Sequence, residues 1–317
     1  MGQKPKPAYG GQAVVEGVMF TGKKVYVTAI RRKDNSIEYL ELEKKEKEWV
    51  NKLRKIPFLR GNVALVEASA YGSTHLNFST ERYDIHPEED EKILPTQQPS
   101  KLTLWLGVAV VGVLSFLFSK IIFTVVPAIV AHTLFKSWFP THLGQNIVEG
   151  VIKTFLLFGY LYVISLTPLV KRLFQYHGAE HKVINCYEED KKLTVQNVQD
   201  ASRFHYRCGS SFIIFTILIG GFVYLMLPSE PLMERIFYRI LFLPVVIGIS
   251  FEVLQLTNKF RDVPILRFLG YPGLWLQKLT TKEPTNEQIE VSIASFRRML
   301  EHDQNTLQKE NGQHQAI

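Results

Sequence analysis

The pattern of apolar and polar positions divides the chain into three parts. Residues 1–101 and 257–317 are rich in polar and charged side chains, whereas residues 102–256 contain long, nearly uninterrupted apolar runs. A soluble domain spaces its apolar residues with a period of 2 or 3.6, and runs of 18 or more apolar residues are typical of segments that cross a bilayer. The central part therefore predicts an α-helical polytopic membrane protein.

Four apolar runs stand in this central part, and together they predict about four transmembrane helices. The first run contains Lys120 and Pro127 and is longer than the roughly 20 residues that one crossing needs, so it is either one tilted, kinked helix or one helix followed by a re-entrant piece. We expect one crossing there, because two would make the distribution of positive charges inconsistent. The four runs are residues 102–135, 147–170, 210–227 and 236–256.

The basic residues predict the orientation of these spans. Of the 37 Lys and Arg residues, seventeen lie in residues 1–101, seven in the loop 171–209 and eight after Leu256, whereas Lys136 and Arg235 are alone in the other two connections. Positively charged loops mark the cytosolic side. We therefore expect a multi-pass protein of the cell membrane that has both termini and the loop 171–209 in the cytosol, with the lipid bilayer as its partner.

The polar N-terminal part predicts a small cytosolic α+β region over residues 1–83, followed by an acidic, Pro-containing linker over 84–101. A glycine pair opens a β-rich run, the Val25 and Val27 side chains share one face of a second strand, and a turn leads into a returning strand. The expected strands are 10–20, 23–30 and 37–42, and the expected helices are 43–55 and 60–81.

The C-terminal part predicts an interfacial and helical segment over residues 257–300 and a disordered, Gln-rich tail over 301–317. Thr285 and Gln288 form a capping box at the start of a helix. The apolar stripe of this helix should pack on its own domain. It consists of Ile289, Ile293, Phe296 and Leu300. The N- and C-terminal regions also offer surfaces for a cytosolic protein partner.

The net charge of +7 does not indicate a nucleic-acid partner, because no basic patch with interleaved aromatics and no binding motif is present. The basic residues are explained by the orientation of the spans. The two cysteines, Cys186 and Cys208, form no disulfide framework in a chain of this length. The glycine pair at 10–11 lacks the pattern of a phosphate-binding loop.

The most chemistry-like motif is His177-Gly-Ala-Glu180-His181, which follows the second run. It matches the H-x-x-E-H pattern of inverted zincins. On a helix, His177 and His181 share a face and can bind one cation, and Glu180 is placed to act as a general base. A five-residue match also arises by chance, and Gly178 weakens a helix by about 1 kcal/mol.

Other ionisable side chains are expected at the same membrane level. His205 and Cys208 stand directly before the third run, and Glu252 stands near the cytosolic end of the fourth. A catalytic zinc needs three protein ligands and one open position. His177, His181 and His205 would supply three, and Cys208 and Glu252 are alternatives for the third place.

At these motifs the chain resembles the YqhQ family of bacterial membrane proteins, a family of unknown function. The resemblance covers nearly the whole chain and rests on four segments: Gly10–Val18, Tyr176–Lys182, Arg207–Phe212 and Pro272–Pro284. Members of this family are usually labelled predicted metal-dependent enzymes, so the resemblance implies the same expectation for this chain. Family members often read Met-Met-Arg-Gly where this chain has Met19-Phe-Thr-Gly22, so the chain lacks the basic side chain at position 21.

These observations lead to one principal hypothesis and two alternatives. The principal one is a membrane-embedded, zinc-dependent hydrolase at the cytosolic face, whose substrate could be a peptide, a lipid ester or an amide. The first alternative is a non-catalytic scaffold or regulator with a structural metal or none. The second is a small transporter, suggested by Lys120, Glu149 and Glu252 and weakened by the lack of an internal repeat.

Overall fold

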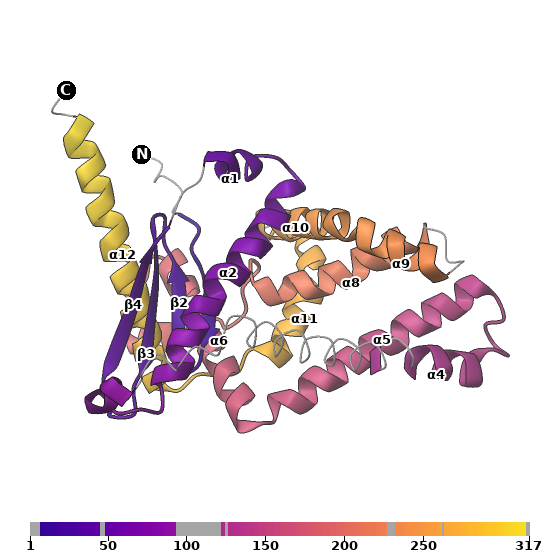
Figure 1. Cartoon of the computed structure of the whole chain (residues 1–317), viewed down its shortest axis with the longest axis horizontal. Coiled ribbons are helices and arrows are strands. Elements are labelled where there is room, and N and C mark those ends of the chain that lie inside the picture. The colour runs from indigo at the N-terminus through magenta and orange to yellow at the C-terminus, as the bar shows by residue number, and fades with distance from the viewer. Residues whose placement is uncertain are drawn as a thin grey trace. The chain divides into compact units, whose positions relative to one another are not determined.

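The computed structural model describes residues 7–44, 48–92, 122–123, 126–226, 232–261 and 263–314 (Figure 1). The chain forms two compact units, which we describe separately. One combines Met1–Pro87 with Pro168–Ile317, and the other is Glu88–Thr167. The protein is mostly helical with a small N-terminal antiparallel sheet.

The sheet of the larger unit has four strands in the order β1-β2-β3-β4. The expected first strand is in fact a hairpin of two strands, because the chain reverses at Val15–Glu16, where Glu16 has a positive φ of 54°. The second and third expected strands are confirmed as β3 and β4. The strands are β1 (Gly10–Val14), β2 (Gly17–Thr21), β3 (Val25–Arg31) and β4 (Ile37–Glu43).

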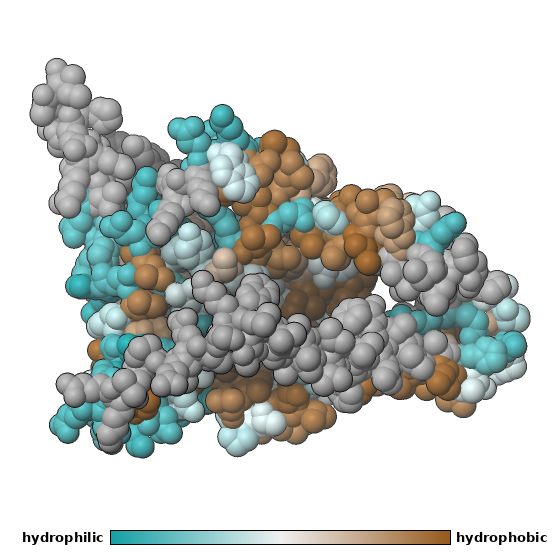
Figure 2. All heavy atoms as spheres, viewed as in Figure 1, coloured by the Kyte–Doolittle hydropathy of each residue, from teal (hydrophilic) through white to brown (hydrophobic). Residues whose placement is uncertain are grey.

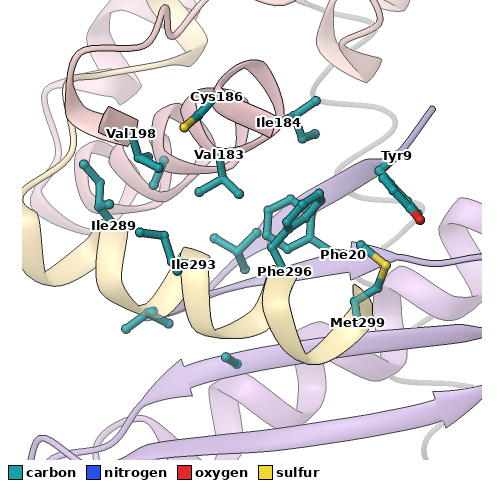
Figure 3. Packing of buried hydrophobic residues seen from close by; sticks show 14 of the residues in the cluster. Tyr9, Phe20, Val183, Ile184, Cys186, Val198, Ile289, Ile293, Phe296 and Met299 are labelled. Atoms are coloured by element: carbon teal, nitrogen blue, oxygen red, sulfur yellow. The ribbon is translucent and has the colours of Figure 1, made fainter. Parts of the chain in front are cut away.

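Helices cover both faces of this sheet, and the alternation of side chains along β3 explains how. Val25, Val27 and Ala29 belong to the main core on one face, against α6 (Pro168–Glu188) and α12 (Asn286–His314). Figure 3 shows Phe20, Phe296 and Met299 in this core. The sheet thus joins the N-terminal segment to helices from the middle and the end of the chain.

The opposite face of the sheet packs on α2 (Leu59–Arg82). Tyr26 stacks on Tyr71 with ring centroids 4.4 Å apart, and Thr28 Oγ1 lies 2.6 Å from His75 Nδ1. The helix expected at 60–81 is confirmed as α2, whereas the one expected at 43–55 is the shorter α1 (Glu48–Leu53).

The start of α12 confirms the predicted capping box. The Thr285 backbone N–H donates to Gln288 Oε1 at 2.9 Å, and the Gln288 N–H donates to Thr285 Oγ1 at 3.4 Å. The apolar stripe of the helix is buried in the main core, as expected. The helix continues to His314, into the segment expected to be disordered, because its Glu, Gln and Lys residues are good helix formers that extend an existing helix.

The second apolar run is divided between two helices. α5 (His142–Ser165) ends before Pro168, which opens α6, because the residue preceding a proline is disfavoured in the helical conformation. Within the described residues, Leu143–Ser165 is the one helical stretch long and apolar enough to cross a membrane; the third run, α8 (Gly209–Leu225), is apolar but shorter.

The fourth run is not one continuous helix. It consists of α9 (Leu232–Leu241) and α10 (Leu243–Lys259), with Pro244 in the first turn of α10, where the missing N–H costs no hydrogen bond. Of the first run, α4 (Val126–Phe135) is described. The remainder up to residue 121, including Lys120, and residues 93–101 of the expected linker lie outside the described residues.

The remaining described elements are short. They are η1 (Pro87–Lys92), α7 (Val195–Gln199), η3 (Leu266–Gly270) and α11 (Tyr271–Thr280). α11 packs closely on α8, where a Cβ added to Gly273 would lie 2.6 Å from Ser211 Cβ. Apolar residues are exposed over α8, α9 and α10, which appear brown in Figure 2.

Candidate metal centre

Helix α6 carries the two histidines of the motif on one face. The rings of His177 and His181 have centroids 4.5 Å apart, as the i, i+4 spacing predicts. His181 is 1% exposed. The helix is therefore the support on which the site is built.

The third member of the group is Cys208, the N-cap residue of α8. Its Sγ lies 3.2 Å from His177 Nε2, and one ligand atom from each of His177, His181 and Cys208 lies within 4.8 Å of the others. Two residues from α6 and one from the start of α8 thus converge, although about thirty positions separate them in sequence.

Backbone carbonyls determine which nitrogen of each ring faces the cysteine. His177 Nδ1 lies 2.8 Å from the Thr280 carbonyl, and His181 Nδ1 lies 2.6 Å from the Arg203 carbonyl. A carbonyl oxygen only accepts, so each Nδ1 carries a proton, and Nε2 is the nitrogen of each ring that is left to bind a metal ion. Metal-binding histidines commonly have this second hydrogen bond, which fixes the tautomer and the ring orientation.

The glycine of the motif permits this arrangement. A Cβ on Gly178 would lie 2.1 Å from the Lys282 carbonyl oxygen, so the segment after α11 contacts the α6 backbone directly. The Lys282 N–H also donates to the Phe174 carbonyl at 2.9 Å. Gly178 lowers the stability of the helix, but it permits the contact that brings the Thr280 carbonyl to His177.

Glu180 is buried beside the same group, at 5% exposure. Its carboxylate interacts with the Gly11 backbone N–H, and a Cβ on Gly11 would lie 3.0 Å from Glu180 Cγ. The second glycine of the N-terminal pair therefore allows close approach of β1 to this carboxylate. Burial raises the pKa of Glu180, and the two nearby imidazoles oppose the rise.

The charges of the group reinforce one another. Burial would raise the pKa of the Cys208 thiol, but His177 and His181 bring it well below its usual range. Burial would lower the pKa of His177, whereas Cys208 and Glu180 raise it to about 9. The cysteine is therefore held in the thiolate form that binds metals.

His205, expected as the third ligand, lies next to this group but outside it. Its ring is 5.7 Å from that of His181, and its Nε2 faces Glu188 Oε1 at 3.8 Å. The Gln277 side chain fixes its backbone by bonds to the His205 N–H and carbonyl, at 2.9 and 2.8 Å. Cys208 takes the place next to His177 instead.

Glu188 organises the residues around His205. It forms ion pairs with Arg207 and Arg261, the latter at 3.1 Å. Although burial raises the pKa of Glu188, its interactions with His205 and Arg207 hold that pKa far below its usual range. This carboxylate fixes the residue that directly precedes Cys208.

Glu252, the remaining candidate, and Cys186, the second cysteine, lie elsewhere. Glu252 forms an ion pair with Arg60 and accepts the Phe58 N–H at 3.0 Å. Cys186 belongs to the main hydrophobic core. Neither is a member of the group formed by His177, His181 and Cys208.

Sequence reasoning missed the support of α6 by the N-terminal hairpin. Glu16, at the hairpin turn, forms an ion pair with Arg172 and accepts a hydrogen bond from the Tyr176 hydroxyl at 3.1 Å. The signal was present, since Glu16 lies in the same motif as the glycine pair. The role of Glu16 could not be inferred, because nothing in the sequence indicates that Arg172 and Tyr176 are its partners.

The donor set is suited to zinc. Two imidazole nitrogens and a thiolate are preferred zinc ligands, and a tetrahedral zinc ion with bonds of about 2.0–2.3 Å separates its ligand atoms by roughly 3.5 Å. His177 Nε2 and Cys208 Sγ are 3.2 Å apart, and the three ligand atoms lie within 4.8 Å of one another. Small movements of these side chains would bring them to the separations of such a site. Three ligands leave a fourth position open.

Comparison with known proteins agrees with the resemblance found in the motifs. Residues 56–302 match the family described as "Protein of unknown function (DUF1385)". The chain belongs to this family. A DUF1385 relative, the "Uncharacterized protein YqhQ" of Bacillus subtilis (strain 168), is 57% identical over 315 residues, which cover 99% of each chain. No solved structure matches the chain.

Proposed function

We propose that this DUF1385 protein is a membrane-embedded, zinc-dependent hydrolase that works at the cytosolic face. His177, His181 and Cys208 would hold the zinc ion, and Glu180 would act as the general base. The observation that carries the proposal is the pair of Nδ1–carbonyl bonds, which leaves both Nε2 atoms available beside Cys208 Sγ.

The membrane location is supported by the apolar surface and by the charges. Large apolar side chains are widely exposed on the apolar helices, for example Phe155 of α5 at 75% and Phe222 of α8 at 66%. Soluble monomers rarely expose contiguous apolar patches of this kind. The clustering of Lys and Arg in the termini and the loop 171–209 supports a cytosolic position of the metal centre.

The chemistry is divided between the ion and the chain. A bound zinc ion supplies a Lewis acid and lowers the pKa of water in its open position. The Thr280 and Arg203 carbonyls hold the two imidazoles in the tautomer that presents Nε2. Glu180 offers a buried carboxylate that can accept a proton and later return it to a leaving group.

A structural metal is the second candidate function, because the described ligands are deeply buried. His181 and Cys208 are only 1% and 5% exposed. Such a site would lock the start of α8 to α6. It would serve a scaffold whose N- and C-terminal regions present a surface to a cytosolic partner.

The transport hypothesis has less support. Glu149 pairs with Lys153 at 2.5 Å, one turn along the same helix, and Glu252 pairs with Arg60. Two of the three residues that suggested a pathway thus have partners of their own, and Lys120 lies outside the described residues.

Metal analysis of the purified chain combined with Glu180→Gln tests the proposal. We expect one zinc ion per chain in both proteins, and loss of hydrolysis in Glu180→Gln alone, measured on a panel of ester, amide and peptide substrates. Glu189→Gln, which changes an exposed carboxylate directly after α6, is the matched control and should keep both properties. Absence of stoichiometric transition metal would overturn the zinc site, and a fully active Glu180→Gln would overturn the role of Glu180 as general base. Bound metal without hydrolysis in the unsubstituted chain would leave the structural role.

A further inference from the structure

Residues 48–66, comprising α1 and the first two turns of α2, expose an unusual number of large apolar side chains. Val66 is 68% exposed and Trp49 is 61% exposed. These residues lie in the part of the sequence expected to be a cytosolic domain, where such side chains would normally be covered. The exposed set is Trp49, Ile56, Phe58, Leu59, Leu65 and Val66.

This segment is fixed to the apolar helix α10. Besides its ion pair with Arg60, Glu252 accepts the Phe58 N–H at 3.0 Å, and Asn62 Nδ2 donates to the Pro244 carbonyl at 3.0 Å. A Cβ on Gly248 would lie 2.4 Å from the Phe58 carbonyl oxygen. The close approach and the polar bonds hold the start of α2 across the fourth apolar run.

The inner face of the segment continues the apolar surface of the other helices. α2, α8 and α10 enclose an apolar groove of about 220 Å³, which Leu65, Phe212 and Phe251 help to line. The outer surfaces of α8 and α10 are also apolar, with Phe222 66% and Val245 44% exposed. Through Leu65, the exposed set of residues 48–66 therefore borders the helices that we assign to the membrane.

Basic residues stand among these apolar side chains. Lys52 and Lys55 are exposed, whereas Arg54 is paired with Glu67. Apolar and aromatic side chains combined with lysines are typical of segments that lie in the plane of a membrane interface, where lysines reach anionic headgroups. The groove that α2 shares with α8 and α10 connects this segment to helices that we assign to the membrane, which favours the bilayer over a protein partner as its cover.

We propose that residues 48–66 lie in the cytosolic interface of the bilayer, with their apolar side chains among the acyl chains and with Lys52 and Lys55 at anionic headgroups. The inference rests on the membrane location proposed above. It moves the start of the membrane-associated chain from residue 102 to residue 48, and it places the entrance of the α2–α8–α10 groove at the level of the lipid.

Spin labels on single cysteines test this placement in the full chain. Val66→Cys, Glu81→Cys and Phe222→Cys are each labelled in nanodiscs of phosphatidylcholine and phosphatidylglycerol. Collision with oxygen, which concentrates in lipid, is compared with collision with a water-soluble nickel chelate. Glu81 lies on the same helix with its side chain 60% exposed and is the matched control. The unsubstituted chain, whose cysteines are buried, is the labelling blank.

We expect the oxygen-to-nickel ratio at residue 66 to resemble that at residue 222 and to exceed severalfold the ratio at residue 81. A ratio at 66 equal to that at 81 would overturn the inference while the membrane location stands. Low collision with both reagents at 66 would indicate a protein cover and would also overturn it. Nickel-accessible labels at both 66 and 222 would remove the proposed membrane location itself.

Discussion

Cys208 and His205 stand three positions apart before α8, and the structure gives them different roles. The Cys208 Sγ lies within 4.8 Å of nitrogens of both motif histidines, whereas the His205 Nε2 faces Glu188. We therefore predict that Cys208→Ala loses most of its bound zinc, because a two-histidine site lacks the third ligand of a stable zinc centre. Elemental analysis of the purified variants is the measurement.

His205→Ala provides the matched control. It removes a buried imidazole whose ring lies 5.7 Å from that of His181, and it should keep its zinc, with a loss of stability rather than of metal. The assignment of Cys208 would be contradicted by the reverse pattern, with zinc retained in Cys208→Ala and lost in His205→Ala.

The sequence predicts the motif histidines correctly at this scale because their relation is local. The i, i+4 spacing is sufficient to place His177 and His181 on one face of a helix. The choice between Cys208 and His205 is not local. It depends on Gln277, which fixes the His205 backbone, and on the Arg203 carbonyl, which orients His181. No spacing within the sequence indicates these contacts.

At the scale of elements, the junction between α6 and the segment after α11 controls the site. Gly178→Ala would place a methyl group 2.1 Å from the Lys282 carbonyl oxygen, and a backbone atom cannot move aside without shifting Thr280. We predict that this variant unfolds at a lower temperature, with a cost of about 1–3 kcal/mol typical of overpacking, and that it binds zinc more weakly. Thermal unfolding and zinc titration measure the two effects.

Gly221→Ala separates this contact from the general effect of alanine in a helix. A Cβ on Gly221 of α8 meets no atom within 4 Å, and alanine favours a helix by about 1 kcal/mol over glycine. The control should therefore leave zinc binding unchanged and should not lower the unfolding temperature. Equal behaviour of the two variants would show that the contact with Lys282 is unimportant.

The elements themselves could be predicted to different degrees. The alternation in Val25–Ile30 and the capping box at Thr285 correctly indicated β3 and α12, because both patterns reflect local geometry. The apolar runs indicated less. Pro168 and Pro244 divide two of them into separate helices, and composition alone does not show whether a proline bends a span or ends it.

At the scale of the whole molecule, the larger unit places segments from distant parts of the sequence in one folded layer. α12 packs on β2 and β3, and α6 packs on β1. The sheet, α6 and α12 therefore lie on the same side of any membrane that the chain crosses. The chain must cross an even number of times between α2 and α6, and again between α6 and α12. This argument is independent of the positive charges and leads to the same even number of crossings.

The location of the α4–α5 connection follows from this parity. α5 joins α6 at Pro168, and its apolar stretch of 23 residues spans about 35 Å, enough for one crossing, so its N-terminal end should face outward. We predict that Ser137→Cys reacts with a membrane-impermeant maleimide on intact cells. Lys191→Cys, and a cysteine-containing tag after Ile317, should react only after the membrane is opened. A label at 137 that also requires opening of the membrane would mean that α5 does not cross.

Labels at 191 and at the C-terminus on opposite sides would contradict the single folded layer, since α6 and α12 could then not share the core around Phe296.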